Sequence, residues 1–179
     1  MIKIVQPPEP LVSLDEMKVA LGESGDDRND FIEMLVMAAQ GELDGPNGWV
    51  GISVAPQIAQ ITASAFEPAI RLIGGPVFGV TVNYFDTDGD AQTLSDTGYI
   101  VGSDGTISLA DGAEWPALAE RADAVTVTYD VGIDDGDDPR VALMRTAIMM
   151  HVRMTMDMWE PETSRKAIES IVRPLWVIP

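Results

Sequence analysis

The chain has 179 residues, of which 46% are apolar, no cysteine, and a formal net charge of −18 at pH 7. This length and composition are typical of one globular domain, whereas the lack of cysteine excludes disulfide bonds, thiolate metal sites and cysteine nucleophiles and fits a reducing cytoplasm. The excess of carboxylates argues against conventional DNA binding, because phosphate contacts depend on Lys and Arg.

The charge is unevenly distributed along the chain. Residues 1–138 hold 5 basic and 25 acidic side chains, whereas residues 139–179 hold 6 basic and 4 acidic ones. Such acidity suits a surface past which DNA slides without binding, but plain solubility or a salt-adapted host explains it equally well.

Two helices are predicted before any strand. Ser13 and Glu16 have the spacing of a capping box, which predicts a short helix from Leu14 to about Leu21. A second helix is predicted from Asp26 or Asp27 to the GPNG cluster at 45–48. The apolar residues that recur at helical spacing in this second helix are Phe31, Leu35, Ala38 and Ala39.

From Trp49 onward the pattern changes to short runs rich in Val, Ile and Thr, which predict strands. The predicted strands are 50–55, 57–65, 69–73, 78–86, 91–94, 98–102, 105–109 and 124–131. Asp-Gly pairs at 88–89 and 104–105 are typical of hairpin turns, because Gly tolerates positive φ. The sequence therefore predicts an antiparallel β meander, inserted at about 49–131.

The stretch 138–160 is the longest apolar-periodic segment, and Pro139 and Pro161 bracket it as helix boundaries. One apolar stripe of this predicted helix consists of Val141, Met144, Ile148, Val152 and Trp159. A neighbouring stripe consists of Leu143, Ala147, Met150, Met154 and Met158. Arg145 and Arg153 within the segment argue against a membrane span.

The two stripes give this helix more apolar surface than one core face requires, since together they cover roughly 240° of its circumference. The first stripe is predicted to pack the domain core. The second is covered either by other parts of this chain or by a neighbouring subunit. Six of the ten Met residues lie in this helix, and Met is common on surfaces that adapt to a partner.

The C-terminal part predicts a final helix from Thr163 to Val172, ended by Pro174. The last residues, PLWVIP, are apolar for a chain end. We therefore expect an α+β fold with a single domain over 1–173, followed by an extended apolar tail over 174–179 that packs on its own core or docks on a partner.

No stretch carries a strong catalytic or metal-binding motif. Asp86, Asp88 and Asp90 resemble the start of a calcium loop, but the Gly is at the fourth position instead of the sixth, and Thr97 stands where the bidentate Glu belongs. His151 is the single histidine and lies on the apolar arc of the long helix, which favours a packed residue over a catalytic base. We expect no enzyme, no cofactor and no metal. The alternative is a β-rich module that binds a ligand or cation through Trp115 and Tyr129 or through the Asp-rich loops.

The order of these segments resembles the head-to-tail connector, or head-completion adaptor, proteins of long-tailed bacteriophages and gene transfer agents. The stretches that carry the resemblance, in chain order, are PPEPLVSLDEMKVAL, DDRNDFIEMLVMAAQGELD, GPVFGVTVNYFDTDGDAQTL, DGTISLADGAEWPAL, DAVTVTYDVGIDDGDDPRVALMRTAIMMHV and SIVRPLW. Together they span nearly the whole chain.

The resemblance implies a structural protein of the virion neck that assembles in the host cytoplasm. It implies a ring of about a dozen identical subunits under the portal, extending the DNA channel toward the tail. Expected partners are the chain itself, the portal, the next head-completion or tail protein, and double-stranded DNA that passes without specific binding; no membrane is expected. The subunit-interface candidates are Met150, Met154 and Met158. The portal-docking candidates are Leu175, Trp176, Val177 and Ile178.

Overall fold

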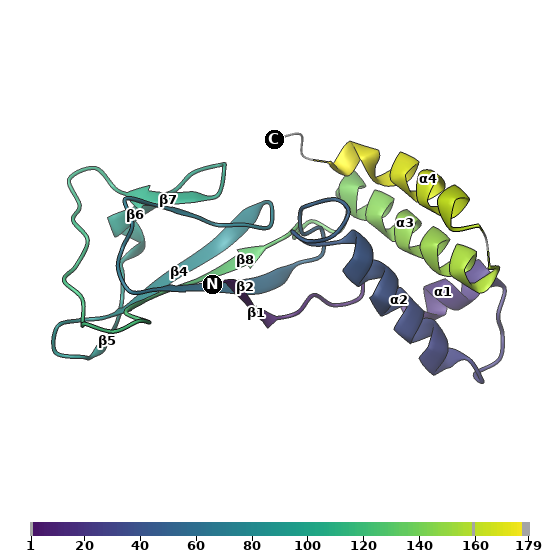
Figure 1. Ribbon diagram of the computed structural model, residues 1–179, viewed down its shortest axis with the longest axis horizontal. Coiled ribbons are helices and arrows are strands. Elements are labelled where there is room, and N and C mark those ends of the chain that lie inside the picture. The colour runs from purple at the N-terminus through teal and green to yellow at the C-terminus, as the bar shows by residue number, and fades with distance from the viewer. Residues whose placement is uncertain (1, 159, 177–179) are drawn as a thin grey trace. The chain divides into compact units, whose positions relative to one another are not determined.

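The computed structural model describes residues 2–158 and 160–176 and divides into two compact units (Figure 1). The β unit comprises Met1–Pro8 and Pro56–Gly132, and the helical unit comprises Glu9–Ala55 and Ile133–Pro179. The α+β class is confirmed, since the described residues form four α-helices and antiparallel sheets. The single domain over 1–173 stays a prediction. Among the described residues, no helix is both long enough and apolar enough to cross a membrane.

The predicted capping box is confirmed at the start of α1 (Leu14–Leu21). The Ser13 hydroxyl accepts the backbone N–H of Glu16, and the Glu16 carboxylate accepts the backbone N–H of Ser13. The helix ends at Gly22, whose φ of 74° is left-handed and favours glycine.

The second predicted helix is α2 (Asn29–Leu43), and the apolar residues noted in it from the sequence differ in burial, since Ala39 is buried and Leu35 packs half-buried against the core. Phe31 is 48% exposed and Ala38 is exposed as well. The buried residues are Ile32, Val36, Ala39, Gln40 and Leu43. Apolar residues at helical spacing lie on two sides of α2, so periodicity alone could not decide which side is buried. Packing against α1 and α3 buries the side that carries Ile32, Val36 and Ala39.

The long helix α3 (Pro139–Met156) begins as predicted and ends earlier than predicted. Asp138 is its N-cap, and its carboxylate accepts the backbone N–H of Arg140. The chain leaves the helix at Asp157, and Met158 has a φ of 52° in the left-handed region. This reversal lets α4 (Pro161–Val172) pack against α3, with the 3-10 turn η2 (Arg173–Leu175) following it. The final helix thus starts two residues before the predicted Thr163.

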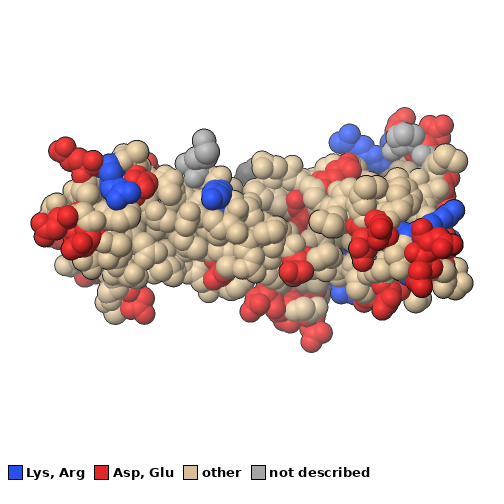
Figure 2. Space-filling model, turned by 90° about the horizontal axis from the view of Figure 1, so that it is seen from below, with Lys and Arg blue, Asp and Glu red and all other residues tan. Residues whose placement is uncertain are grey.

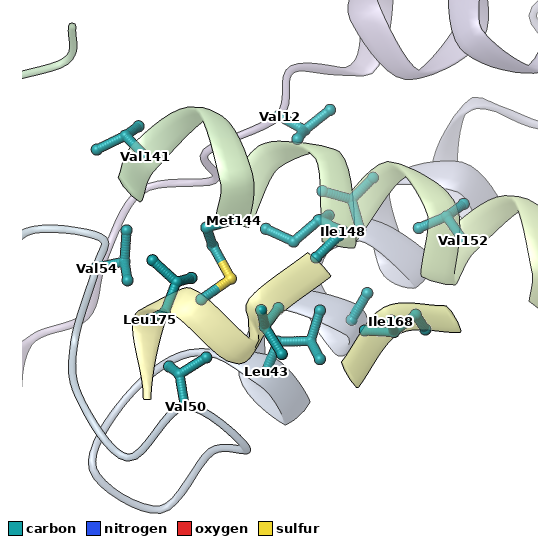
Figure 3. Packing of buried hydrophobic residues seen from close by; sticks show 14 of the residues in the cluster. Val12, Leu43, Val50, Val54, Val141, Met144, Ile148, Val152, Ile168 and Leu175 are labelled. Carbon is teal, nitrogen blue, oxygen red and sulfur yellow. The ribbon is translucent and has the colours of Figure 1, made fainter. Parts of the chain in front are cut away.

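The core of the helical unit lies between α2, α3 and α4, with residues before α1 and after α2 closing it (Figure 3). The first predicted stripe of α3 is confirmed as core, since Val141, Met144, Ile148 and Val152 are all buried. Figure 3 shows these side chains with Val12, Leu43, Val50, Val54, Ile168 and Leu175. Trp159 of the same stripe lies outside the described residues.

The predicted strand at 50–55 is wrong, because these residues form an irregular segment that closes the C-terminal end of α2. The backbone N–H of Val50 donates to the carbonyl of Leu43. The buried carboxylate of Asp44 accepts the backbone N–H groups of Val54 at 2.6 Å and Ala55 at 3.0 Å. Because these amides are satisfied by the helix end, they are not available to a sheet.

The β unit has a five-stranded sheet in the order β1-β2-β8-β4-β5 and a three-stranded sheet in the order β3-β7-β6, all antiparallel. The strands are β1 (Ile2–Gln6), β2 (Gln57–Ala63), β3 (Ala69–Arg71), β4 (Val77–Phe85), β5 (Ala91–Thr93), β6 (Tyr99–Val101), β7 (Thr106–Leu109) and β8 (Val125–Val131). Seven of these were predicted; β1 was not predicted as a strand.

The meander prediction is wrong, because the last strand, β8, lies between β2 and β4. Alternate residues of β8 are buried, including Val127 and Tyr129. The hydroxyl of Tyr129 donates to the carbonyl oxygen of Ile73 at 3.0 Å, which satisfies the polar end of a buried ring. A strand with so apolar a face is best buried between neighbours rather than at a sheet edge.

Candidate functional site

The three predicted interface methionines occupy different environments in the helical unit. Met154 is 5% exposed and belongs to the core, and Met150 is half-buried against the same core. Met158 follows the end of α3 and is 89% exposed. The second stripe of α3 is therefore largely covered by α2 and α4 of the same chain. The assignment of these three residues to a subunit interface stays a prediction, and of the three only Met158 has a fully accessible side chain.

A cavity of about 450 Å³ opens beside Met154 and Met158, between α3, α4 and the C-terminal end of α2. Its apolar lining includes Trp49, Met154 and Ile168, and its polar lining includes Glu42, His151 and Arg165.

His151 is held in this cavity by two neighbours. Its Nε2 lies 3.1 Å from the Glu42 carboxylate, and its ring lies edge-on to Trp49 with centroids 6.4 Å apart. The adjacent Thr155 hydroxyl donates to the His151 backbone carbonyl at 2.8 Å. The same hydroxyl lies 3.5 Å from Nδ1 of the His151 ring. These contacts with Glu42, Trp49 and Thr155 hold the ring in place and support a packed histidine.

The described residues of the predicted docking tail differ in how far their side chains are exposed. Leu175 lies in η2, is 3% exposed and belongs to the core of the helical unit. Trp176 is 43% exposed. Val177 and Ile178 lie outside the described residues. Docking of this tail stays a prediction, but Leu175 already has a partner in its own core.

An exposed apolar face on α2 was missed by the sequence analysis. Phe31, Met34 and Met37 are 48%, 56% and 65% exposed, and Ala38 and Gly41 are exposed on the same half of the helix. We call these five residues the α2 face. Its signal was present in the sequence, because α2, like α3, has apolar residues at helical spacing on two sides.

The acidic loops are explained by local hydrogen bonds. The Asp86 carboxylate accepts the Gln92 side chain and the backbone N–H groups of Asp90 and Asp88, and these bonds lower the pKa of Asp86. Asp138 caps α3, and Asp135 accepts the backbone N–H of Asp137. In the described part of the chain, no three His, Asp or Glu side chains are grouped closely enough to hold a metal ion.

The aromatic residues of the alternative ligand-binding reading have internal partners. Trp115 stacks on Phe66, with ring centroids 4.4 Å apart, and Tyr129 is 1% exposed in the β sheet core. Neither ring is presented as an open platform for a ligand.

Carboxylates gather on the surfaces of both units, whereas Lys and Arg are sparser (Figure 2). In the helical unit, α2 carries three exposed acids and no Lys or Arg, namely Asp30, Glu33 and Glu42. The exposed basic residues of this unit include Arg153 on α3 and Arg165 and Lys166 on α4, whose side chains are 63%, 66% and 72% exposed.

No protein-family profile and no curated protein matches this sequence. Solved structures do match over the full chain. A chain in the virion of a native gene transfer agent particle aligns with a TM-score of 0.67 and 12% identity, covering 100% of this chain and 96% of that one. The chain shares its fold with a gene transfer agent particle protein.

Two structures of the particle's neck match equally well. The neck of the native particle, computed with C12 symmetry, gives a TM-score of 0.65, and the neck of the empty particle, computed with C6 symmetry, gives 0.64. Both matches have 12% identity and cover 100% of this chain and 96% of the matched chain. The resemblance to neck proteins of gene transfer agents is therefore confirmed at the level of the fold.

Proposed function

We propose that this protein is a structural, non-enzymatic connector of a virion neck, in which copies form a ring under the portal and extend the DNA channel toward the tail. The observation that supports this proposal most is the fold match over the whole chain to neck structures computed with sixfold and twelvefold symmetry. A ring of about twelve copies is consistent with both symmetries. The ring assembles in the host cytoplasm and joins the virion there.

The charge of the chain suits a DNA channel. With 29 acidic and 11 basic residues, it repels the phosphate backbone within a Debye length, about 8 Å at physiological salt. DNA would pass such a surface without binding to it. Recognition partners of the ring are then proteins, namely the portal on one side and the next head-completion or tail protein on the other.

The C-terminal residues are the proposed portal contact. Trp176 is 43% exposed next to Val177 and Ile178, and burial of such an aromatic side chain at an interface is strongly favourable. Leu175 contributes by anchoring the base of the tail in the helical core. Met150 and Met158 remain proposed contacts between subunits.

Binding of the full-length chain to portal-bearing capsids tests this function. We expect the wild-type chain to co-sediment with such capsids and to form rings visible by electron microscopy. Removal of the residues after Leu175 keeps the core intact, so this variant should retain the wild-type circular dichroism spectrum and melting temperature but lose capsid binding.

Substitution of Val19 by Gln is the matched control, since Val19 is 82% exposed on α1 and outside the tail. A wild-type chain that stays monomeric both alone and with portal-bearing capsids would refute the connector function. Unchanged binding of the chain truncated after Leu175 would refute portal docking through the tail alone.

A further inference from the structure

We infer that Asn47 is a site of spontaneous deamidation, and that the fold itself requires the glycine that makes this asparagine reactive. The chain has three asparagines, and of these Asn47 is the one followed by glycine. The inference concerns a chemical modification of the helical unit and does not rest on the proposed ring, so either can fail without the other.

Deamidation at an Asn-Gly pair is an intramolecular reaction. The backbone nitrogen of Gly48 forms a bond to Cγ of Asn47, the C–N bond of the side-chain amide breaks, and the departing NH2 leaves as ammonia with the proton of the Gly48 N–H. Water then opens the five-membered succinimide. Attack of water on the side-chain carbonyl gives aspartate, whereas attack on the backbone carbonyl gives isoaspartate. Glycine favours the first step because it has no Cβ to hinder its nitrogen.

The three asparagines differ in what surrounds them. Asn47 is exposed in the irregular segment after α2. Asn29 is the first residue of α2, and its side-chain NH2 donates to the Asp26 carboxylate at 3.2 Å. Asn83 lies in β4 between β5 and β8, and its side-chain oxygen accepts the Thr93 hydroxyl at 2.8 Å. Regular backbone structure and these side-chain bonds keep the latter two amides away from the next backbone nitrogen, so Asn47 is the reactive one.

Gly48 is required by the space around it. A Cβ at this position would lie 2.7 Å from the carbonyl oxygen of Leu43 and would also collide with the carbonyl oxygen of Asp44. Both are backbone atoms at the end of α2, which cannot move aside as the end of a flexible side chain can. Any other residue would therefore push the segment away from the helix, and the fold keeps an unhindered nitrogen next to Asn47.

Residues 45–48 form a turn that limits the reaction in the native state. The N–H of Gly48 donates to the carbonyl of Gly45 at 3.0 Å, and Pro46 occupies the second position, which is favoured in a type I turn. While this bond is intact, the Gly48 nitrogen keeps its proton and is turned toward Gly45. Deamidation then requires local opening of the turn, so it should be slower in the folded chain than in the unfolded one.

The isoaspartate product adds one carbon to the backbone at position 47. Directly after it, the N–H of Trp49 donates to the carbonyl of Glu42 at 3.1 Å, and the N–H of Val50 donates to the carbonyl of Leu43 at 3.2 Å. These bonds hold the segment against the end of α2, and a longer backbone displaces their donors. We expect the isoaspartate form to melt about 2–4 °C lower for each hydrogen bond lost. The aspartate product leaves the backbone unchanged.

Peptide mapping by mass spectrometry tests the site. The folded full-length chain and the same chain in urea are incubated at mildly alkaline pH and sampled over time. We expect Asn47 to lose its amide in both, faster in urea, while Asn29 and Asn83 keep theirs in the folded chain. Full retention of the Asn47 amide in the folded chain, or equal loss at all three positions, would overturn the inference. Equal rates at Asn47 with and without urea would overturn the protective role of the turn.

Two variants separate the modification from its effects. Asn47→Gln is the unreactive control, because its longer side chain would have to close a six-membered ring, and it should stay unmodified. Freshly purified Asn47→Asp carries the added charge on a normal backbone and should melt like wild type. The isoaspartate form of the wild type, separated by anion exchange and identified by an isoaspartate-specific methyltransferase, should melt lower than both. An isoaspartate form that melts like wild type would overturn the expected loss of hydrogen bonds at the end of α2.

Discussion

The carboxylate of Asp44 holds the segment 50–55 against the end of α2, and removing it should destabilise the helical unit strongly. Its oxygens accept three backbone N–H groups, from Val54 at 2.6 Å, Ala55 at 3.0 Å and Gly45 at 2.9 Å. Substitution of Asp44 by Ala removes all three acceptors at once.

The size of the loss in free energy of unfolding depends on how many of these N–H groups are left without an acceptor. The N–H of Gly45 also donates to the carbonyl of Ile52, so it remains bonded. Val54 and Ala55 are both 0% exposed, and each buried N–H without an acceptor costs ~1–3 kcal/mol. We therefore expect Asp44→Ala to lower the free energy of unfolding by about 4 kcal/mol.

Urea unfolding followed by far-UV circular dichroism, which reports the helices of the helical unit, measures this loss. Asp27→Ala is the control, because Asp27 is exposed and its substitution should change the free energy of unfolding by less than ~0.5 kcal/mol. A loss below about 1 kcal/mol for Asp44→Ala, at an unchanged denaturant slope, would show that Val54 and Ala55 find other acceptors and would refute this reasoning.

Three further predictions concern single side chains. Burial raises the pKa of Asp44, against the opposing effect of its N–H donors, so the native state keeps this proton to higher pH than the unfolded chain. The free energy of unfolding should then fall as pH rises from ~4 through the raised pKa, and titration of stability should show that Asp44→Asn lacks this fall. Tyr129→Phe should cost ~0.5–1.5 kcal/mol in urea unfolding, because the Ile73 carbonyl loses its donor; no change would mean that water replaces it. Met154→Ala should lower the free energy of unfolding by ~2–5 kcal/mol, since it leaves a cavity in the core, whereas Met158→Ala should change it by less than ~0.5 kcal/mol; equal effects would contradict the burial difference.

Local signals in the sequence predicted the elements well. The capping box at Ser13 and the proline at the start of α3 depend on contacts within a few residues, so both can be predicted from the sequence alone. Seven of the eight strands were predicted for the same reason, because alternating side chains and Asp-Gly turns are local features.

The candidate assembly surfaces were harder to predict, because exposure depends on which of two apolar sides a helix buries. Both α2 and α3 have two such sides. In α3 the second apolar side is mostly covered by α2 and α4, so Met154 lies in the core. In α2 the second apolar side stays exposed. Phe31, Met34 and Met37 therefore form an exposed apolar surface of the kind that had been expected on α3.

The sequence by itself determined the α+β class, the helix caps, the long core stripe of α3 and the acidic character of the chain, because each of these follows from neighbouring residues or from composition. Only the tertiary structure decided that β8 lies between β2 and β4, that 50–55 closes α2 through Asp44, and that the free apolar face belongs to α2. These three outcomes depend on contacts between segments far apart in the chain, where several arrangements satisfy the same periodicity and packing selects one of them.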